Sequence, residues 1–528
     1  MLQVFMPPVP VLAIFRRLLT SLCLLGSSTL WAVEPAHRLA DAAMNRDFAT
    51  VNALISQHAN PNERGQFDTP ALLWLVSVDE VATAAKLLKA GADVNLATPL
   101  GVAALNLAVS NGSAAMTKLL LDAGAKPDTT EPSGETLLMI AAGNGDLAIV
   151  QALLDHGANV NARDPHFAQN ALMFAAREGH ADVVALLLKA KAEVNVHTKV
   201  EPAPPFIKPN SVPGFGFGVG IIRGGTPADR GRREPQQGGM TPLLYAARNG
   251  HVEVAKLLLA AGADLNAREA NDIWPLFSAV SNNQVPMAEF LLQQKGVLIN
   301  GQDWYGRSPI WDAVNVRNLY VNGTTLVNGI DRAPVLQLIE HLLAAGADPN
   351  VRTKETPPTR NHILPGTGTL EWVDFTGQTP FLTAAQAGDT TVMKLLLKYG
   401  ADPKINTFRG TSPLMAAAGV NWVYAQSWSE GEAQLLAAVK MCRELGMDVN
   451  QANSMGITAL HGAANRGSDS IIQYLVEQGA DLTVQDNEHR SALDWAKGVF
   501  LATHPAEAKP KSMALISSLL TSQHKEIR

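Results

Sequence analysis

Apolar residues recur along this chain with a spacing typical of α-helices. The i, i+3, i+4 pattern of one buried helical face is kept by Val254, Leu257, Leu258 and Leu259. Gly262 follows, and glycine is the residue that most readily adopts the left-handed conformation that ends a helix. The pattern therefore predicts a helix that ends just before Gly262.

A second helix is predicted ahead of each such stretch. Thr241 places a hydroxyl at a helix N-cap, and Pro242 stands at the first helical position, where its missing N–H costs nothing. The same arrangement recurs in Thr379-Pro380 and Ser412-Pro413. Alanine pairs such as Ala141-Ala142 would let these first helices pack closely against their neighbours. The chain is thus predicted to consist of helix pairs.

The helix pairs recur with a nearly constant period. The apolar residue that opens each first helix is Leu72, Leu105, Leu138, Leu172, Leu243, Leu276, Ile310, Phe381, Leu414, Leu460 and Leu493. Successive intervals are 33, 33, 34, 71, 33, 34, 71, 33, 46 and 33 residues. Such regularity is the signature of a repeat protein.

Two segments carry a resemblance to a known family. Residues 239–251 and 456–467 share a Gly-x-Thr-x-Leu opening, and each leads through a helical stretch to Gly-Ala-Asp, at 262–264 and 479–481. Over about residues 36–523 the chain resembles the ankyrin-repeat family, whose unit is a β-turn plus two antiparallel helices. The resemblance implies an all-α solenoid of about twelve helix-pair units, with short β-hairpin fingers and several loop insertions. Residues 36–62 and 486–523 would form its end units.

The long intervals locate insertions. Residues 198–238 are rich in proline and glycine and lack helical periodicity, so we expect a long flexible loop and not a thirteenth repeat. Further insertions are expected near 318–331, 353–374 and 420–432. The predicted organisation is a signal peptide at 1–32, repeats at 33–197, the loop at 198–238, repeats at 239–485, and a capping repeat with tail at 486–528.

The first residues have the order of a secretory signal. Arg16 and Arg17 precede an apolar run over 18–25, and small residues lead to Ala32, where we expect cleavage. An uncleaved anchor is the alternative, but only 16 residues run from Leu18 to Val33, against roughly 20 for a membrane span. We therefore expect a periplasmic or secreted protein without a transmembrane span after cleavage.

Composition and motifs argue against catalysis and nucleic-acid binding. A net charge of −6 over 528 residues gives no general attraction to nucleic acid. The 13 histidines show no metal-ligand spacing, and no nucleophile elbow or phosphate-binding motif occurs. His180, His251 and His461 occupy positions where the resemblance implies structural hydrogen bonds. No catalytic, cofactor-binding or metal-binding residue is therefore predicted, and no cofactor.

The resemblance places recognition on the finger tips and the exposed surface of the first helices. Large aromatic residues and arginine dominate protein interfaces. At finger tips they are Trp304, Tyr305, Arg307, Phe375 and Phe408. A stripe on the first helices, two residues after each opening position, holds Trp74, Leu107, Ile140, Phe174 and Tyr245. We take Trp74, Phe174 and Tyr245 from this stripe as candidate contacts. The alternative is that these bulky residues pack under inserted loops.

The most economical hypothesis is an exported, monomeric scaffold that binds a protein partner. Two other hypotheses remain open: an accessory subunit of a periplasmic enzyme, and a secreted effector that binds host proteins. An enzyme is the least favoured alternative. The sequence does not identify the partner.

Overall fold

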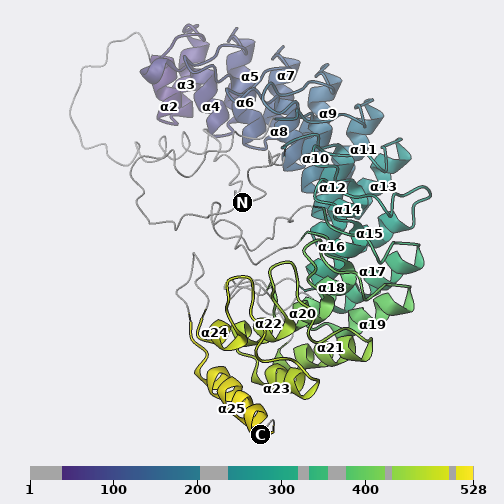
Figure 1. Cartoon of the computed structure of the whole chain (residues 1–528). Helices are drawn as coiled ribbons and strands as arrows, with labels where there is room; N and C mark the ends of the chain where they lie inside the picture. Colours follow the sequence, from purple (N-terminus) through teal and green to yellow (C-terminus); the bar gives the residue numbers. More distant parts are fainter. Residues whose placement is uncertain are drawn as a thin grey trace, which may run out of the picture. The chain divides into compact units, whose positions relative to one another are not determined.

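The computed structural model describes residues 38–201, 236–318, 332–354, 376–421, 431–498 and 507–526. Within these ranges the chain forms twelve consecutive pairs of α-helices (Figure 1). They fall into two compact units. The N-terminal unit comprises the described residues of 38–200 and 238–267, and the C-terminal unit those from 268 onward with 201 and 236–237. The predicted all-α architecture of about twelve helix pairs is confirmed.

The N-terminal unit contains six of these pairs. Its first helices are α2 (Arg38–Met44), α4 (Ala71–Ser77), α6 (Ala104–Ser110), α8 (Leu137–Asn144), α10 (Ala171–Glu178) and α12 (Pro242–Asn249). Its second helices are α3 (Phe48–Ser56), α5 (Val81–Lys89), α7 (Ala114–Asp122), α9 (Leu147–Asp155), α11 (Ala181–Lys189) and α13 (Val252–Ala260).

The C-terminal unit contains the other six. Its first helices are α14 (Pro275–Ser281), α16 (Pro309–Arg317), α18 (Pro380–Ala387), α20 (Pro413–Ala418), α22 (Ala459–Arg466) and α24 (Ala492–Ala496). Its second helices are α15 (Val285–Leu292), α17 (Arg332–Ala344), α19 (Thr390–Lys398), α21 (Glu432–Glu444), α23 (Asp469–Glu477) and α25 (Pro510–Glu526).

Within each unit, the first helices stack on one another and form the centre of the core. The paired alanines Ala141, Ala142, Ala175 and Ala176 are fully buried where α8 meets α10. Methyl-sized side chains let the two backbones approach closely, as the sequence predicted. Each second helix then covers its own first helix with one apolar face, such as Val254 and Leu258 of α13.

The predicted helix starts are present. The side-chain oxygens of Thr241, Thr379 and Ser412 accept hydrogen bonds from backbone N–H groups three residues on, and proline follows each of them at the first helical position. Each cap satisfies one N–H that the helix itself leaves without a partner. At the opposite end of α13, Gly262 has a φ of +89°, the left-handed conformation that the sequence predicted.

Successive repeats are joined by turns that we call fingers. In several of them the two sides meet at single antiparallel bridges, for example Arg64 with Pro70 and Thr130 with Thr136. The predicted β-hairpins are therefore present in the described fingers in a minimal form, as isolated bridges without extended ladders.

The stack of the N-terminal unit continues past the longest insertion. Residues 202–235 lie outside the described residues, yet α12 packs on α10 as α10 packs on α8. The residues at 319–331, 355–375 and 422–430, and the predicted signal peptide at 1–32, also lie outside the described residues.

A buried ion-pair cluster anchors the helices that flank the insertion between α16 and α17. Arg317, at the end of α16, donates from Nε to the carboxylate of Asp389 at 2.8 Å. Arg332, at the start of α17, donates to the same carboxylate at 3.1 Å. Asp389 is the N-cap of α19, so one buried carboxylate ties three helices together.

Candidate interaction surface

Several finger tips are tight turns held by an acceptor side chain at the start of the turn. The Asp164 carboxylate accepts from the backbone N–H groups of His166, Phe167 and Gln169 at 2.6–2.9 Å. Asp303 and Asp486 hold their own turns in the same way, accepting from Arg307 and Arg490. Because the acceptor supplies the turn geometry, the residue at the tip can vary in chemistry without loss of the turn.

Large apolar side chains are exposed at several of these tips. In the N-terminal unit the exposed fractions are 57% for Phe67, 65% for Leu100, 52% for Phe167 and 45% for Val200. In the C-terminal unit Phe408 is 59% exposed. Five of the six exposed large hydrophobic residues of the described chain therefore lie in fingers; the sixth, Leu147, begins the second helix α9.

Phe408 is the predicted tip residue that the structure leaves most open. The guanidinium of Arg352 lies over its ring at 4.2 Å from the centroid, and also donates to the carbonyl of Asn406 at 2.7 Å. One face of the ring is thus supported and the remainder is free to contact a partner. The neighbouring predicted residue, Phe375, lies outside the described residues.

The finger that contains Trp304, Tyr305 and Arg307 differs from the expectation. The sequence analysis placed all three at a finger tip as candidate contacts, but Tyr305 is only 7% exposed and Arg307 is largely buried. Arg307 forms an ion pair with Asp303 at 2.8 Å and approaches Asp312 of α16 at 3.7 Å. Its guanidinium also faces the rings of Phe277 and Tyr305.

Arg307 therefore fastens this finger to helices α14 and α16, which corrects the expected exposure of Arg307 and Tyr305. Trp304 is half-buried and meets Tyr305 edge to face, with ring centroids 4.8 Å apart. Burial raises the pKa of the Asp303 carboxyl even though Arg307 acts in the opposite direction. A role for these residues in binding stays a prediction.

The first-helix stripe is less exposed than expected. Trp74 and Phe174 are buried, and Tyr245 is half-buried. Phe174 packs against α8, the first helix of the preceding repeat. Its ring lies so close to Gly143 that a Cβ added to this glycine would be 3.3 Å from it. Tyr245 accepts a hydrogen bond from Gln169 at 2.6 Å, and burial raises the pKa of its hydroxyl. The stripe thus contributes to packing between repeats, and its contact with a partner stays a prediction.

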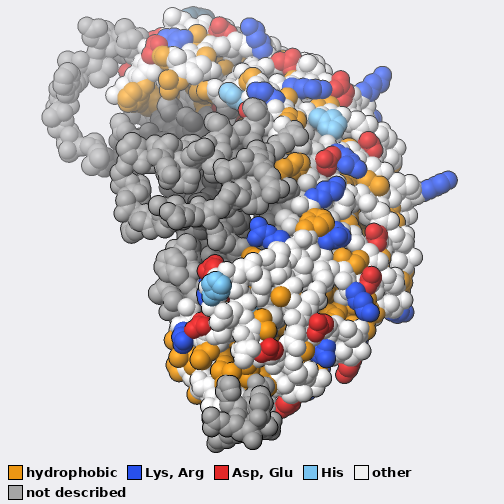
Figure 2. Space-filling view, viewed as in Figure 1, with side chains coloured by type: hydrophobic (Ala, Val, Ile, Leu, Met, Phe, Trp, Pro, Cys, Tyr) orange, Lys and Arg blue, Asp and Glu red, His pale blue; other side chains and the backbone are white. Residues whose placement is uncertain are grey.

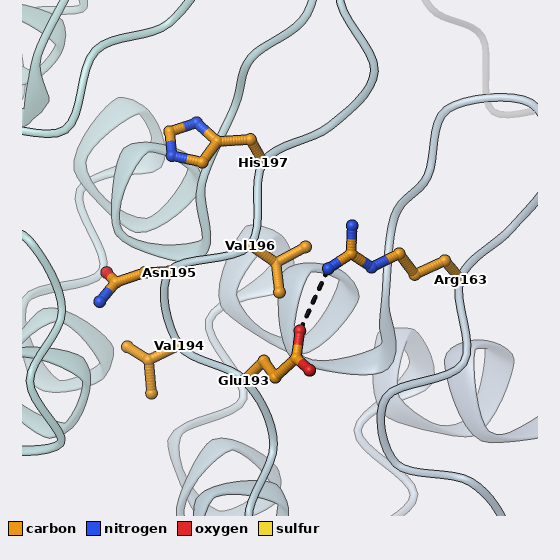
Figure 3. A pocket seen from close by; sticks show the side chains of 6 residues that line it. All are labelled: Arg163, Glu193, Val194, Asn195, Val196 and His197. Atoms are coloured by element: carbon orange, nitrogen blue, oxygen red, sulfur yellow. Dashed lines mark hydrogen bonds and ion pairs between the residues drawn. The ribbon is translucent and has the colours of Figure 1, made fainter.

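A shallow depression of about 570 Å³ lies between two fingers of the N-terminal unit (Figure 3). Arg163 and Glu193 on its rim form an ion pair at 3.1 Å, and His197 contacts the carbonyl of Gly239. Asn195 bonds both Gly262 and Asp264 of the next repeat. These polar groups are engaged in structural bonds, so the depression presents no pre-formed set of catalytic groups.

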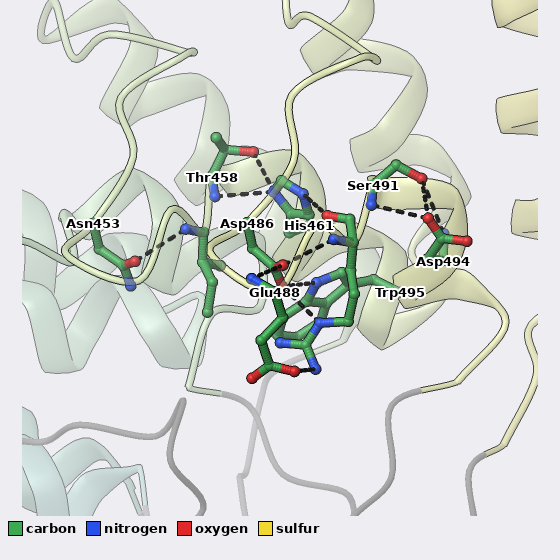
Figure 4. A network of polar contacts seen from close by, with 10 residues as sticks. Asn453, Thr458, His461, Asp486, Glu488, Ser491, Asp494 and Trp495 are labelled. Carbon is green, nitrogen blue, oxygen red and sulfur yellow. Dashed lines mark hydrogen bonds and ion pairs between the residues drawn. The ribbon is translucent and has the colours of Figure 1, made fainter. Parts of the chain in front are cut away.

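The predicted structural histidines are confirmed. His180 contacts the backbone carbonyl of Gly143 in α8, and His251 contacts that of Arg177 in α10, each at 3.0 Å. In both cases the carbonyl belongs to the first helix of the preceding repeat. His461 is buried, accepts from Thr458 and reaches the carbonyl of Arg490 (Figure 4). In the described residues no three His, Cys, Asp or Glu side chains are placed to hold a metal ion.

Charged side chains of one sign do not gather on the visible face of the described chain. On the face shown in Figure 2, Lys and Arg side chains are interspersed with Asp and Glu. Among the described residues, no helix has both the length and the hydrophobicity needed to cross a membrane.

The sequence analysis did not identify Phe67, Leu100, Phe167 and Val200. A positional signal was present: the first three lie five residues before the opening residues Leu72, Leu105 and Leu172, and Val200 follows Phe167 by 33. Comparing the residue five positions before each opening residue would have identified the first three, and the repeat period then leads from Phe167 to Val200. A search for aromatic clusters and arginine did not identify them.

Comparison with protein families gives matches along much of the chain. A model described as ankyrin repeats in three copies matches residues 39–131 and 105–198. A single ankyrin-repeat model matches residues 238–270, 376–407 and 455–487. The matched ranges include repeats of both units.

Similar curated proteins come from animals. The chain is 35% identical over 138 residues to mouse NF-kappa-B inhibitor alpha, which covers 25% of this chain and 41% of that protein. It is 27% identical over 291 residues to the Caenorhabditis elegans ankyrin repeat and KH domain-containing protein mask-1, covering 44% of this chain and 11% of that protein. The matches thus span less than half of the length of these relatives.

Proposed function

The chain belongs to the ankyrin-repeat family, and on that premise we propose that it is an exported scaffold that binds a protein partner through its finger tips and first-helix surface. Ankyrin repeats are generally protein-interaction scaffolds. The observation that supports the proposal most directly is the exposure of large apolar side chains at the tips in both units. A polar residue would serve the turn equally well, so the turn itself does not require these side chains.

The energetic argument rests on the cost of exposing these groups to water. Full burial of a large apolar side chain provides about 1.5–3 kcal/mol, and each partly exposed tip residue forgoes a share of this free energy. Scattered exposed hydrophobic residues are normal on protein surfaces, but here five of the six in the described chain lie in fingers. A partner that covers the tips would recover this free energy on binding.

Photo-crosslinking tests the binding surface. p-Benzoylphenylalanine would replace Phe408 at a finger tip in one protein, and Leu147 at the start of α9 in a matched control. Both positions are exposed, so neither replacement should change the thermal midpoint. We expect a discrete crosslinked partner from the tip position alone, in the fraction where the protein resides. Crosslinks of equal yield from both positions would contradict recognition through the fingers.

Export is the second part of the proposal. The Arg16-Arg17 pair and the apolar run over 18–25 support cleavage after Ala32. N-terminal sequencing of the protein from the envelope or secreted fraction should begin at Val33. An intact Met1 in protein recovered from the cytoplasm would show that the scaffold works inside the cell.

A further inference from the structure

Four exposed side chains of the N-terminal unit occupy the same place in successive fingers. We name Phe67, Leu100, Phe167 and Val200 the tip ridge. The intervals along the chain are 33, 67 and 33 residues, which equal one, two and one repeats. Ser133 is 33 residues after Leu100 and lies in the intermediate finger. The ridge therefore crosses five consecutive fingers, with one polar position at its centre.

Contacts between neighbouring fingers fix the register of the ridge. Arg64 of the first finger donates to the carbonyl of Ala97 in the second at 3.0 Å. The backbone N–H of Lys199 donates to the carbonyl of Phe167 at 2.8 Å, which places Val200 beside the tip of the preceding finger. The exposed side chains are consequently arranged in order along one edge of the unit.

The spacing of the fingers favours one kind of ligand. Packed helices of adjacent repeats lie about 8–10 Å apart, and we infer the same spacing for the fingers, because hydrogen bonds join neighbouring ones. A polyproline II chain rises about 9.3 Å per three-residue turn, so every third side chain falls on the same face at the spacing of the fingers. Three residues of a β-strand span about 10 Å as well, but side chains three positions apart point to opposite faces.

The width of the ridge argues against a helix. An amphipathic helix presents an apolar stripe more than about 100° wide and normally docks in a groove. Each of the four apolar fingers contributes a single exposed large apolar side chain to the tip ridge, not the broad stripe that faces a helix. Polyproline II segments dock on aromatic side chains, and Phe67 and Phe167 supply such rings.

Two ion pairs beside the ridge place opposite charges together. Arg64 pairs with Asp68 at 3.3 Å beside Phe67, and Arg163 pairs with Glu193 at 3.1 Å in the fingers of Phe167 and Val200. Each of these ion pairs is locally neutral. An acidic or basic peptide would find no excess of opposite charge in these two pairs.

We propose that the tip ridge binds an extended proline-rich segment of a partner protein, with an apolar residue at every third position. From Phe67 to Val200 the ridge spans four repeat intervals, which corresponds to about 13 residues of polyproline II chain. This inference rests on the proposed scaffold function and specifies the chemistry of its ligand.

Fluorescence anisotropy of labelled peptides with the full chain provides the test. The probe is a synthetic peptide of repeated Leu-Pro-Pro triplets, and the reference peptide has the same composition with irregularly spaced leucines. A third peptide is helical with leucine at every seventh position. We expect the triplet peptide to bind at least about tenfold more tightly than the other two.

Protein variants locate the binding on the ridge. Phe67→Ser/Leu100→Ser and, independently, Phe167→Ser/Val200→Ser should each weaken binding of the triplet peptide by about tenfold or more. Leu147→Ser, an exposed apolar residue outside the fingers, should leave it unchanged. Thermal midpoints should match the parent protein because all five side chains are exposed.

Three results would overturn the inference: equal affinity for the irregular peptide, tighter binding of the helical peptide, or tip variants that bind normally. A dimer that dissociates in the tip variants, seen by light scattering, would instead make a second copy the occupant. If Phe408 crosslinks a partner while the triplet peptide fails to bind, the scaffold function stands and the ligand assignment falls.

Discussion

Individual side chains decide whether a finger is rigidly attached or open to a partner. Arg307 is held by Asp303 and Asp312, so its finger is fastened to the first helices. The Arg352 guanidinium packs against the ring of Phe408, which remains exposed. His461 shows a third role, because both of its ring nitrogens are used inside the core.

We expect His461 to make the stability of the C-terminal unit dependent on pH. Its Nδ1 accepts from the N–H of Thr458 at 3.1 Å, so Nε2 carries the proton and donates to the Arg490 carbonyl. Burial lowers the pKa of His461 below 6.5, while nearby Asp486 raises it and Arg490 lowers it. The neutral ring therefore contributes fully to the free energy of unfolding above pH 6.5. This contribution is lost as the pH falls through the lowered pKa of His461 in the folded state.

Thermal midpoints at pH 7.5 and 5.5 would measure this effect. We expect the parent protein to lose more stability on acidification than His461→Gln, which cannot titrate. Because other histidines titrate in both proteins, the difference between the two slopes isolates His461. Equal slopes would contradict the assignment.

At the scale of the element, asparagines bridge one finger base to the next. Asn62 and Asn95 each donate from Nδ2 to a glycine carbonyl of the following repeat, Gly91 and Gly124, and accept from a backbone N–H two residues further on. Asp128 holds the equivalent position and accepts from the N–H of Asn159, but a carboxylate has no donor for the Gly157 carbonyl.

Asp128→Asn should therefore stabilise the N-terminal unit. The new amide would keep the bond from Asn159 and donate to Gly157, adding about 0.5 kcal/mol, the lower end for a hydrogen bond at an exposed site. The reverse change, Asn95→Asp, removes the donor to Gly124 and should destabilise by about 0.5–1 kcal/mol. Urea denaturation of both variants beside the parent measures the pair. Shifts of the same sign would refute this explanation.

At the scale of the whole molecule, stacking within a unit is not limited to residues that are close in sequence. Helices α12 and α13 follow the insertion at 198–238 but belong to the N-terminal unit. Asn249 donates to the Arg177 carbonyl at 2.7 Å, and Tyr245 accepts from Gln169. These bonds join residues on opposite sides of the insertion.

Brief proteolysis should consequently nick the chain without dividing it. The proline- and glycine-rich composition predicts cleavage within 198–238. Two fragments should appear on a denaturing gel, yet elute as one species in native buffer because α12 remains packed on α10. In urea they should separate. Separate elution in native buffer would mean that the α10–α12 interface cannot hold the nicked protein together.

The repeat period, the helix pairs and their caps could be predicted from the sequence because each depends on local backbone chemistry. Thr241 caps its helix with its own hydroxyl, and Gly262 adopts a left-handed φ that its lack of a side chain permits. Exposure, in contrast, is set by neighbouring repeats. Phe174 is buried against Gly143 of the neighbouring first helix, and Tyr305 is buried where its finger meets Lys354 of the next finger, whereas Phe67 and Leu100 are exposed. Only the tertiary structure could decide which of these side chains is exposed. A side chain of the same type at the same repeat position can be buried or exposed, because its burial depends on the residues that the next repeat places against it.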